Sequence, residues 1–215
     1  MDYGMWEPFY RKILADFGFS QDEDEAVASE LDRLLGGRRA GDAELRALLE
    51  GKEVTVAGNG PNVVAEMPRA RGVLVTADEA TSVALAQGLR PAVLVTDLDG
   101  DVADQVRANL EGTMAVVHGH GDNGLAVRKW APEFRGSTVA TTQSRPVGGL
   151  VNFGGFTDGD RAAFLADHFG AKAIHLVGFD FQNPNAKDRD RETKQRKLDW
   201  SYILLGSLHR DELGL

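Results

Sequence analysis

The stretch Val93-Leu94-Val95-Thr96-Asp97-Leu98-Asp99-Gly100-Asp101 says more about this fold than any other part of the chain. Its apolar half predicts a buried strand, and Gly100 allows a sharp turn where that strand ends. Alternate residues of an extended chain share a face, so the carboxylates of Asp97 and Asp99 are expected to converge. Carboxylates crowded at the end of a strand favour a bound cation, and oxygen ligands suit Mg²⁺ together with a phosphate substrate. A polar turn with solvated aspartates is the alternative interpretation.

Strands and helices are predicted to alternate on both sides of this stretch, from residue 51 onward. The predicted strands are Glu53–Ala57, Gly72–Thr76, Ala92–Thr96, Thr113–Val117, Ser137–Thr141 and Ala173–Val177. The predicted helices are Asp78–Gln87, Val102–Asn109, Leu125–Trp130 and Asp158–His168, with a final helix over residues 188–212. Repeated β–α pairs of this length predict an α/β fold with a mostly parallel, Rossmann-like sheet and helices on both faces.

Residues 1–50 are predicted to form an N-terminal helical region ahead of an α/β catalytic domain over residues 51–215. Apolar residues recur at spacings of three and four from Trp6 to Phe17, which predicts a helix with one apolar stripe. That stripe could serve a homodimer contact as well as a core. Ser20 is a candidate N-cap for a second helix, and the acidic run at residues 22–25 is interpreted as its solvated first turn.

Charge and composition exclude several classes of protein. The 215 residues carry a formal net charge of −9 at pH 7, which argues against a nucleic-acid partner. The chain has no cysteine, which excludes disulfides, thiolate catalysis and Cys-ligated metals. No apolar run is long enough to span a membrane, and the first residues lack a signal-peptide pattern. A cytoplasmic protein without a membrane partner is therefore expected.

Polar motifs follow several predicted strands, at the sheet edge where open α/β folds bind their ligands. Gly58-Asn59-Gly60 follows the first strand, and its backbone amides could approach a phosphate. The six-residue dinucleotide fingerprint is absent, so a tight turn without a ligand explains these residues equally well. Asp78 follows the second strand and could either cap the next helix or face a ligand.

The fourth predicted strand runs into His118-Gly119-His120-Gly121-Asp122-Asn123. Asp122 would join the carboxylates of Asp97 and Asp99 if this strand lies beside the third one. The two histidines are spaced like zinc ligands, but no third nitrogen or sulfur ligand is nearby. Hydrogen bonds to phosphate or charge compensation are therefore the favoured interpretation, with a structural role as the alternative.

The segments after the fifth and sixth strands supply more polar candidates. Thr142, Gln143 and Arg145 could bind phosphate oxygens or the edge of a heterocycle, although a polar loop explains them as well. Asn152 lies in a glycine-rich segment and could hydrogen-bond a planar substrate. Asp180 adds a carboxylate after the last strand.

Residues 187–197 form the one clear positive patch in this acidic chain. Lys187, Lys194 and Lys197 are candidates for contacts with a triphosphate, which needs cationic partners. Ion pairs along an exposed helix are the alternative explanation.

Seven segments, in their order along the chain, resemble the archaeal 6-hydroxymethyl-7,8-dihydropterin pyrophosphokinase family, whose catalytic domain is similar to that of thiamin pyrophosphokinases. The matching segments are residues 58–61, 77–78, 96–100, 118–123, 141–143, 152–162 and 178–181. The resemblance implies Mg²⁺-dependent transfer of pyrophosphate from ATP to the hydroxymethyl group of the pterin, with release of AMP. It implies that Asp97, Asp99 and Asp122 are the catalytic, metal-binding carboxylates.

Thiamin is a less favoured acceptor than the pterin. The segment 118–123 looks like the pterin branch, and the C-terminal β domain usual in thiamin pyrophosphokinases has no counterpart here. The resemblance leaves a tetrahydromethanopterin pathway and a folate pathway equally open, because both use the same intermediate.

Asp97-Leu98-Asp99-Gly100 also resembles the nucleophile motif of haloacid-dehalogenase-type phosphatases. In that family Asp97 would be phosphorylated and Asp99 would act as the acid and base. Asp101 stands where that family prefers Thr or Val, and the motif follows about the third strand instead of the first. A nucleotide-sensing module without turnover is a further alternative. Release of AMP separates the pyrophosphokinase from both alternatives.

Overall fold

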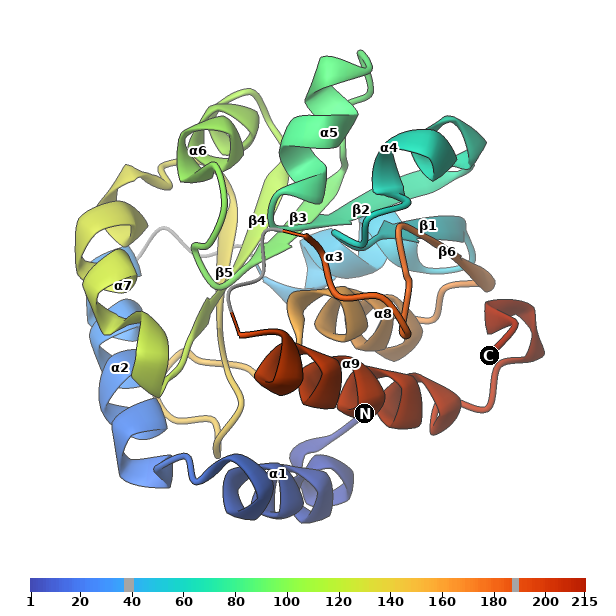
Figure 1. The fold of residues 1–215 in the computed structure, drawn as a ribbon. Helices are drawn as coiled ribbons and strands as arrows, with labels where there is room; N and C mark the ends of the chain where they lie inside the picture. The colour runs from blue at the N-terminus through green and yellow to red at the C-terminus, as the bar shows by residue number, and fades with distance from the viewer. Residues whose placement is uncertain (37–40, 187–189) are drawn as a thin grey trace.

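The computed structural model describes residues 1–36, 41–186 and 190–215 (Figure 1). Its strands are β1 (Glu53–Ala57), β2 (Val73–Ala77), β3 (Val93–Thr96), β4 (Met114–Gly119), β5 (Thr138–Thr142) and β6 (Ala173–Val177). Within the described residues these strands form one parallel sheet in the order β5-β4-β3-β2-β1-β6. The α/β class and the parallel sheet are therefore confirmed, and each strand lies within about two residues of its predicted position.

Helices cover both faces of the sheet, as predicted. They are α1 (Tyr3–Phe17), α2 (Gln21–Leu35), α3 (Asp42–Leu49), α4 (Val63–Glu66), α5 (Ala80–Ala86), α6 (Val102–Leu110), α7 (Gly124–Trp130), α8 (Asp158–His168) and α9 (Arg191–Gly206). One face packs against α3 and α8, and the other packs against α4 to α7 together with α2. Helix α9 lies beside α8 in Figure 1. Among the described residues, none of the helices combines the length and apolarity needed to cross a membrane.

Alternate side chains of each strand build the two halves of the core. Val93 and Val95 join the cluster around α3 and α8, whereas Leu94 joins the cluster around α2, α6 and α7. Neighbouring side chains of a strand point to opposite faces, so a strand covered on both faces must be apolar throughout. This arrangement accounts for the continuous apolar run that leads into Thr96 and the carboxylates beyond it.

The apolar stripe of α1 is buried within the chain. Trp6, Tyr10 and Ile13 are at most 1% exposed and pack against Phe164 of α8 and Leu204 of α9. The division of the chain at residue 50 stays a prediction, and so does a homodimer.

The acidic run at the start of α2 differs in part from the prediction. Asp22 and Glu23 are exposed, but Asp24 is only 2% exposed. Asp24 lies on the same helical face as Ala28 and Leu31, and this face packs against the sheet. The prediction of a solvated face is therefore wrong for Asp24, because helical periodicity turns this one residue of the run toward the core.

Candidate active site

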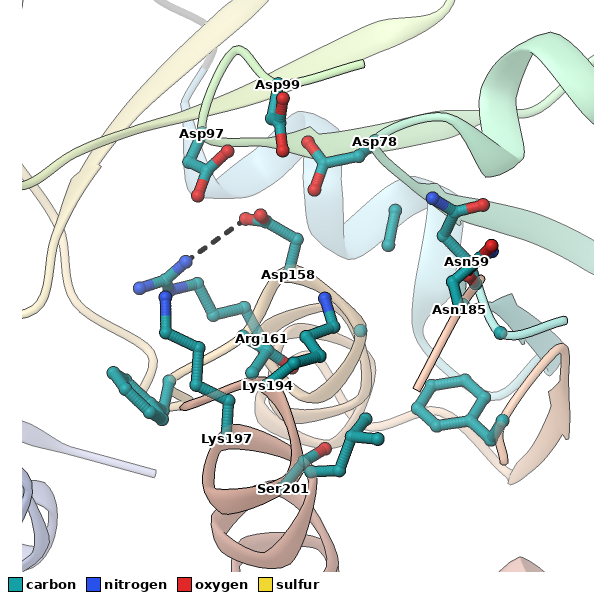
Figure 2. Close-up of a pocket in the computed structure, with 18 of the residues that line it drawn as sticks. Asn59, Asp78, Asp97, Asp99, Asp158, Arg161, Asn185, Lys194, Lys197 and Ser201 are labelled. Atoms are coloured by element: carbon teal, nitrogen blue, oxygen red, sulfur yellow. Dashed lines mark hydrogen bonds and ion pairs between the residues drawn. The ribbon is translucent and has the colours of Figure 1, made fainter. Parts of the chain in front are cut away.

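One cleft collects polar side chains from the loops at the carboxyl ends of the strands, with the start of α8 and one face of α9 as its other walls (Figure 2). Most of the residues predicted for the site line it. They are Gly58, Asn59, Gly60, Asp78, Asp97, Asp99, His120, Asp122, Gln143, Asp180, Lys194 and Lys197. The parallel sheet brings these segments together because every strand ends at the same edge.

Three carboxylates meet in this cleft: Asp78 after β2, Asp97 after β3 and Asp158 at the start of α8. One oxygen atom from each lies within 4.8 Å of the other two. Asp78 Oδ1 is buried and has no hydrogen-bond partner among the described residues. A set of three carboxylate oxygens with one unsatisfied atom fits Mg²⁺, which prefers oxygen ligands. The set differs from the predicted one, because Asp99 and Asp122 are exposed on the cleft wall outside this cluster.

The cluster concentrates negative charge. Burial, together with the charges of Asp158 and Asp97, raises the pKa of Asp78 well above its ordinary value. Burial and the charge of Asp97 also raise the pKa of Asp158. Burial acts in the same direction on Asp97, but His120 and Arg161 outweigh it and lower the pKa of that carboxyl. The three groups together therefore favour the uptake of a proton or a cation.

Two of the turns beside the cluster have unusual backbone conformations. Asp78 has φ 44° and Leu98 has φ 70°, in the left-handed region that residues other than glycine rarely adopt. Asp78 does not cap α5, because the N-cap of that helix is Glu79. Leu98 N donates a hydrogen bond to Thr96 Oγ1 at 2.8 Å, which helps to hold the second turn. Backbone strain of this kind concentrates at functional sites.

The start of α8 directs Asp158 into the cleft. Thr157 and Asp160 form a capping box, in which Thr157 N donates to both carboxylate oxygens of Asp160 at 3.1 Å. Thr157 Oγ1 also donates to Asp160 Oδ2, at 2.7 Å. The buried Arg161 donates from Nη1 to Asp158 Oδ1 at 3.2 Å. Neither Asp158 nor Arg161 is among the residues predicted for the site. An acidic residue and an arginine after a glycine-rich segment were the available signal, but helix capping explains the same pattern.

Helix α9 places positive charge across the cleft from the carboxylates. Lys194 and Lys197 lie one turn apart, and both extend toward Asp158 in Figure 2. Lys197 Nζ lies 5.9 Å from the centre of the Phe156 ring. Lys187 lies outside the described residues. Carboxylates that can hold a cation line one side of this space, and two lysines line the other. Such a space suits a polyphosphate.

Gly58 and Gly60 allow two loops to pack closely. Gly58 N donates to Val177 O at 2.9 Å, and Gly60 N donates to Gly178 O at 2.7 Å. A Cβ on Gly60 would lie 2.6 Å from Gly178 O, which is closer than atoms can approach. Because both amides are engaged inside the protein, they cannot also donate to a phosphate in this conformation. The side chain of Asn59, between them, does line the cleft.

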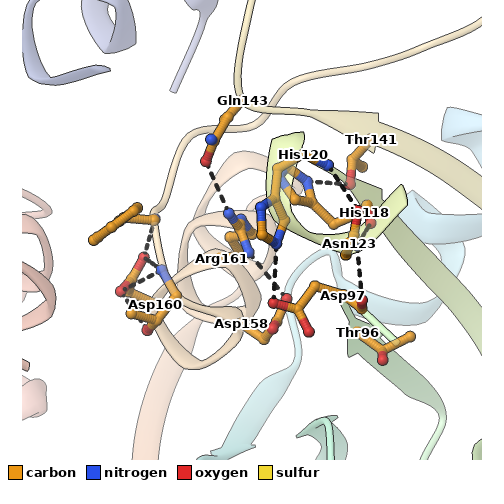
Figure 3. Close-up of polar contacts among 12 residues, drawn as sticks. Thr96, Asp97, His118, His120, Asn123, Thr141, Gln143, Asp158, Asp160 and Arg161 are labelled. Carbon is orange, nitrogen blue, oxygen red and sulfur yellow. Dashed lines mark hydrogen bonds and ion pairs between the residues drawn. The ribbon is translucent and has the colours of Figure 1, made fainter. Parts of the chain in front are cut away.

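His118 and Asn123 do not line the cleft, and Figure 3 shows their hydrogen bonds to neighbouring residues. His118 Nδ1 lies 2.9 Å from Thr141 Oγ1, and burial lowers the pKa of this imidazole well below its ordinary value. Asn123 Nδ2 donates to the backbone oxygens of Asp97 and His118, at 2.7 and 2.8 Å. His120 reaches the cleft itself, with Nε2 3.3 Å from Asp97 Oδ2.

Thr142, Asn152 and Arg145 do not line the main cleft. Thr142 Oγ1 accepts a hydrogen bond from Ser144 N at 3.1 Å, and Asn152 Nδ2 donates to Ser144 O at 3.0 Å. These two residues therefore shape the segment that follows β5. Arg145 is exposed, with its guanidinium 5.8 Å from the centre of the Tyr3 ring. Their predicted roles in substrate binding stay predictions.

Comparison with known proteins agrees with the resemblance seen in the motifs. The family described as 6-hydroxymethylpterin diphosphokinase MptE-like matches residues 38–186. A 6-hydroxymethyl-7,8-dihydropterin pyrophosphokinase from Methanothermobacter thermautotrophicus is 38% identical, over 98% of this chain and 97% of the relative. Relatives of the same name from Methanocaldococcus jannaschii and Pyrococcus furiosus are 35% and 39% identical. They cover 97% and 95% of this chain, and 96% and 93% of their own lengths.

A solved structure of the MAf glycosyltransferase from Magnetospirillum magneticum AMB-1 covers 76% of this chain and 29% of its own, with 20% identity and a TM-score of 0.40. A likeness this low carries no conclusion about activity. The family match and the three relatives, by contrast, extend over most of the chain and include every segment that lines the carboxylate cluster. This chain belongs to the MptE-like family of 6-hydroxymethylpterin diphosphokinases, as its sequence motifs predict.

Proposed function

We propose that this protein transfers the pyrophosphoryl group of ATP to the hydroxymethyl group of 6-hydroxymethyl-7,8-dihydropterin and releases AMP. The names of the three relatives support the reaction and its acceptor. One observation carries the proposal at the level of residues: Asp78, Asp97 and Asp158 face Lys194 and Lys197 across a single cleft. The reaction belongs to pterin biosynthesis of the tetrahydromethanopterin or folate type.

We also propose the partners of the reaction and the compartment in which it takes place. ATP and the pterin are small-molecule partners, and neither nucleic acid nor a membrane takes part. The cytoplasm supplies both substrates.

The two walls of the cleft bind phosphate in different ways, one through carboxylates that can hold a metal ion and the other through lysines. Bound by Asp78, Asp97 and Asp158, Mg²⁺ would neutralise phosphate charge and orient the transferred group. Lys194 and Lys197 on α9 are placed to contact phosphate oxygens from the opposite side. Phosphoryl transfer to an alcohol depends mainly on such charge neutralisation and on in-line positioning of the two reactants.

The acceptor hydroxyl must lose its proton during the transfer. Its oxygen forms a bond to the β-phosphorus of ATP, and the bond from that phosphorus to the oxygen of the α-phosphate breaks, so that AMP leaves. We assign the proton to Asp122, whose exposed carboxylate lines the cleft outside the metal cluster. Asp122 is therefore a candidate general base.

Nucleotide product analysis tests the proposal. The protein is incubated with ATP and Mg²⁺, with and without the pterin, and the nucleotides are separated by anion-exchange chromatography. We expect AMP only when the pterin is present. Free phosphate without AMP would instead support the phosphatase alternative, and binding of ATP without any turnover would support the sensing module.

Four variants locate the site. Asp97→Asn and Asp158→Asn should each lower kcat about 100-fold or more, because each removes a ligand charge worth several kcal/mol. Asp101→Asn is the matched control, because Asp101 caps α6 and Asn is an equally good cap. Full activity of Asp158→Asn together with loss in Asp99→Asn would favour the metal set predicted from the sequence.

A further inference from the structure

Asp24 does not line the cleft, yet its hydrogen bonds lead toward the carboxylate cluster. Its side chain is buried on the inner face of α2, with 2% exposure. Asp24 Oδ2 accepts hydrogen bonds from Tyr10 Oη and Gln143 Nε2, both at 2.7 Å. Asp24 Oδ1 accepts from Gly121 N at 2.8 Å, in the turn that follows β4. This carboxylate therefore joins α1, α2 and two of the loops at the carboxyl edge of the sheet.

Gln143 connects Asp24 to the site itself. Gln143 Oε1 accepts a hydrogen bond from Arg161 Nη2 at 3.1 Å, and Arg161 Nη1 donates to Asp158 Oδ1 at 3.2 Å (Figure 3). A carboxylate only accepts hydrogen bonds and a guanidinium only donates them. The amide of Gln143 between them consequently has one consistent orientation, with its NH₂ toward Asp24 and its oxygen toward Arg161.

The main chain around Gln143 is held by other contacts. Trp6 Nε1 donates to Gln143 O at 2.8 Å, and Ser144 Oγ donates to Glu25 Oε1 at 2.7 Å. A change at Asp24 that keeps its size therefore disturbs the amide of Gln143 while the segment stays attached to α1 and α2. This separation makes the effect of Asp24 on the site measurable apart from its effect on folding.

We propose that Asp24 is a positioning residue for pyrophosphoryl transfer, which acts through Gln143 to hold Arg161 against Asp158. The inference rests on the proposed function, because it requires Asp158 to belong to the active site. Every link in this path is buried: Gln143 is 4% exposed, Arg161 7% and Asp158 5%. Water therefore offers little replacement for a lost hydrogen bond, and a turn of the Gln143 amide leaves the guanidinium of Arg161 held from the side of Asp158 alone.

Asp24→Asn is the first test. The amide of asparagine cannot accept from all three donors, so its NH₂ must face either the amide of Gln143 or the N–H of Gly121. We expect kcat to fall about 10- to 100-fold, as a displacement of about 1 Å at a site can cause. KM for ATP should change less than about 3-fold, because the lysines of α9 are untouched.

Tyr10→Phe is the matched control. It removes one hydrogen bond from the same buried carboxylate but leaves the bonds from Gln143 and Gly121 in place. We expect Tyr10→Phe to lower the melting temperature about as much as Asp24→Asn, with kcat within about 2-fold of wild type. An equal loss of kcat in both variants would mean that Asp24 only supports the fold, and it would overturn the inference.

A double-mutant cycle with Gln143→Met tests the path and provides a second variant if Asp24→Asn folds poorly. Gln143→Met alone should reproduce the fall in kcat, because it removes the acceptor of Arg161 while Asp24 keeps its other two bonds. The double variant should lose less activity than the product of the two single losses. Losses that multiply would show that Asp24 acts independently of Gln143 and would overturn the inference.

Wild type and Asp158→Asn are assayed in parallel, so that a failure of the proposed active site can be told apart from a failure of the proposed role of Asp24. If wild type forms no AMP with the pterin, or if Asp158→Asn keeps full activity, the proposed site fails and the inference fails with it. If wild type is active, Asp158→Asn is not, and Asp24→Asn keeps the wild-type kcat, only the role of Asp24 is overturned.

Discussion

Replacement of Asp78 by asparagine should stabilise the metal-free protein and inactivate it. The change removes one negative charge from the cluster with Asp97 and Asp158, whose nearest oxygens lie within 4.8 Å of one another. Two unit charges at that separation repel by about 3.5 kcal/mol at an effective dielectric constant of ~20. The raised pKa of Asp78 allows proton uptake to relieve part of this repulsion in the wild type. We therefore expect a net gain of about 1–3 kcal/mol at about pH 8 without Mg²⁺.

Thermal unfolding in EDTA measures this gain. For a chain of this size 1 kcal/mol corresponds to about 2–4 °C, so Tm should rise by about 2–12 °C in Asp78→Asn. Added Mg²⁺ should raise the Tm of wild type more than that of the variant, because a ligand stabilises the state that binds it. In the presence of Mg²⁺ the variant should form AMP about 100-fold more slowly or worse.

The pH dependence supplies an independent check with a definite sign. A carboxyl whose pKa is raised in the folded state contributes stability below its ordinary pKa and loses it as the pH rises through the raised value. In EDTA, wild type should therefore lose stability relative to Asp78→Asn as the pH rises above the ordinary carboxyl range. A lower Tm for the variant in EDTA at about pH 8, or a difference that does not depend on pH, would refute the repulsion argument.

Asp122→Asn is the control for Asp78→Asn. Its carboxylate lines the same cleft but is exposed and lies outside the cluster of three. We expect its free energy of unfolding to stay within about 0.5 kcal/mol of wild type. The kcat of Asp122→Asn tests whether Asp122 is the general base, and this test does not depend on the metal cluster.

Three further predictions concern the wall of the cleft and the core. Lys194→Ala should raise KM for ATP about 10-fold, whereas Arg196→Ala, whose guanidinium is paired with a carboxylate of α1, should change it less than about 2-fold. An unchanged KM for Lys194→Ala in steady-state kinetics would place the phosphates elsewhere. Gly60→Ala should lower the free energy of unfolding in urea by about 1–3 kcal/mol, because its Cβ would lie 2.6 Å from a backbone oxygen of the adjacent loop. Its control is Gly206→Ala, where the added Cβ has no atom within 4 Å, so the free energy of unfolding should stay unchanged or rise by up to about 1 kcal/mol. Phe164→Ala should lower the free energy of unfolding in urea by about 3–5 kcal/mol, because it removes a fully buried ring and leaves a cavity. A smaller loss would mean that the core under α1 closes around that cavity.

Local patterns account for the success of the fold prediction. The apolar runs of β1 and β6 and the amphipathic pattern of α8 have the same bounds in the structure as in the prediction. These signals depend on residues within one element, where side-chain periodicity and turn glycines act directly. Helix α5 shows the limit of such signals. The pattern predicts that this helix begins at Asp78, but it begins at Ala80, because the left-handed backbone of Asp78 (φ 44°) does not fit a right-handed helix.

The sequence by itself determined the parallel α/β class, the family, and the polar segments that end on one edge of the sheet. Only the tertiary structure decided which carboxylates meet. Asp97 was expected to pair with Asp99, two residues away, but the turn at Leu98 leaves Asp99 exposed and turns Asp97 toward Asp78 and Asp158. Likewise, nothing local separates Asp24 from the exposed acids beside it, and its partner Gln143 is 119 residues distant. Periodicity reports which way a side chain points within its own element, whereas the packing of distant elements decides what it meets there.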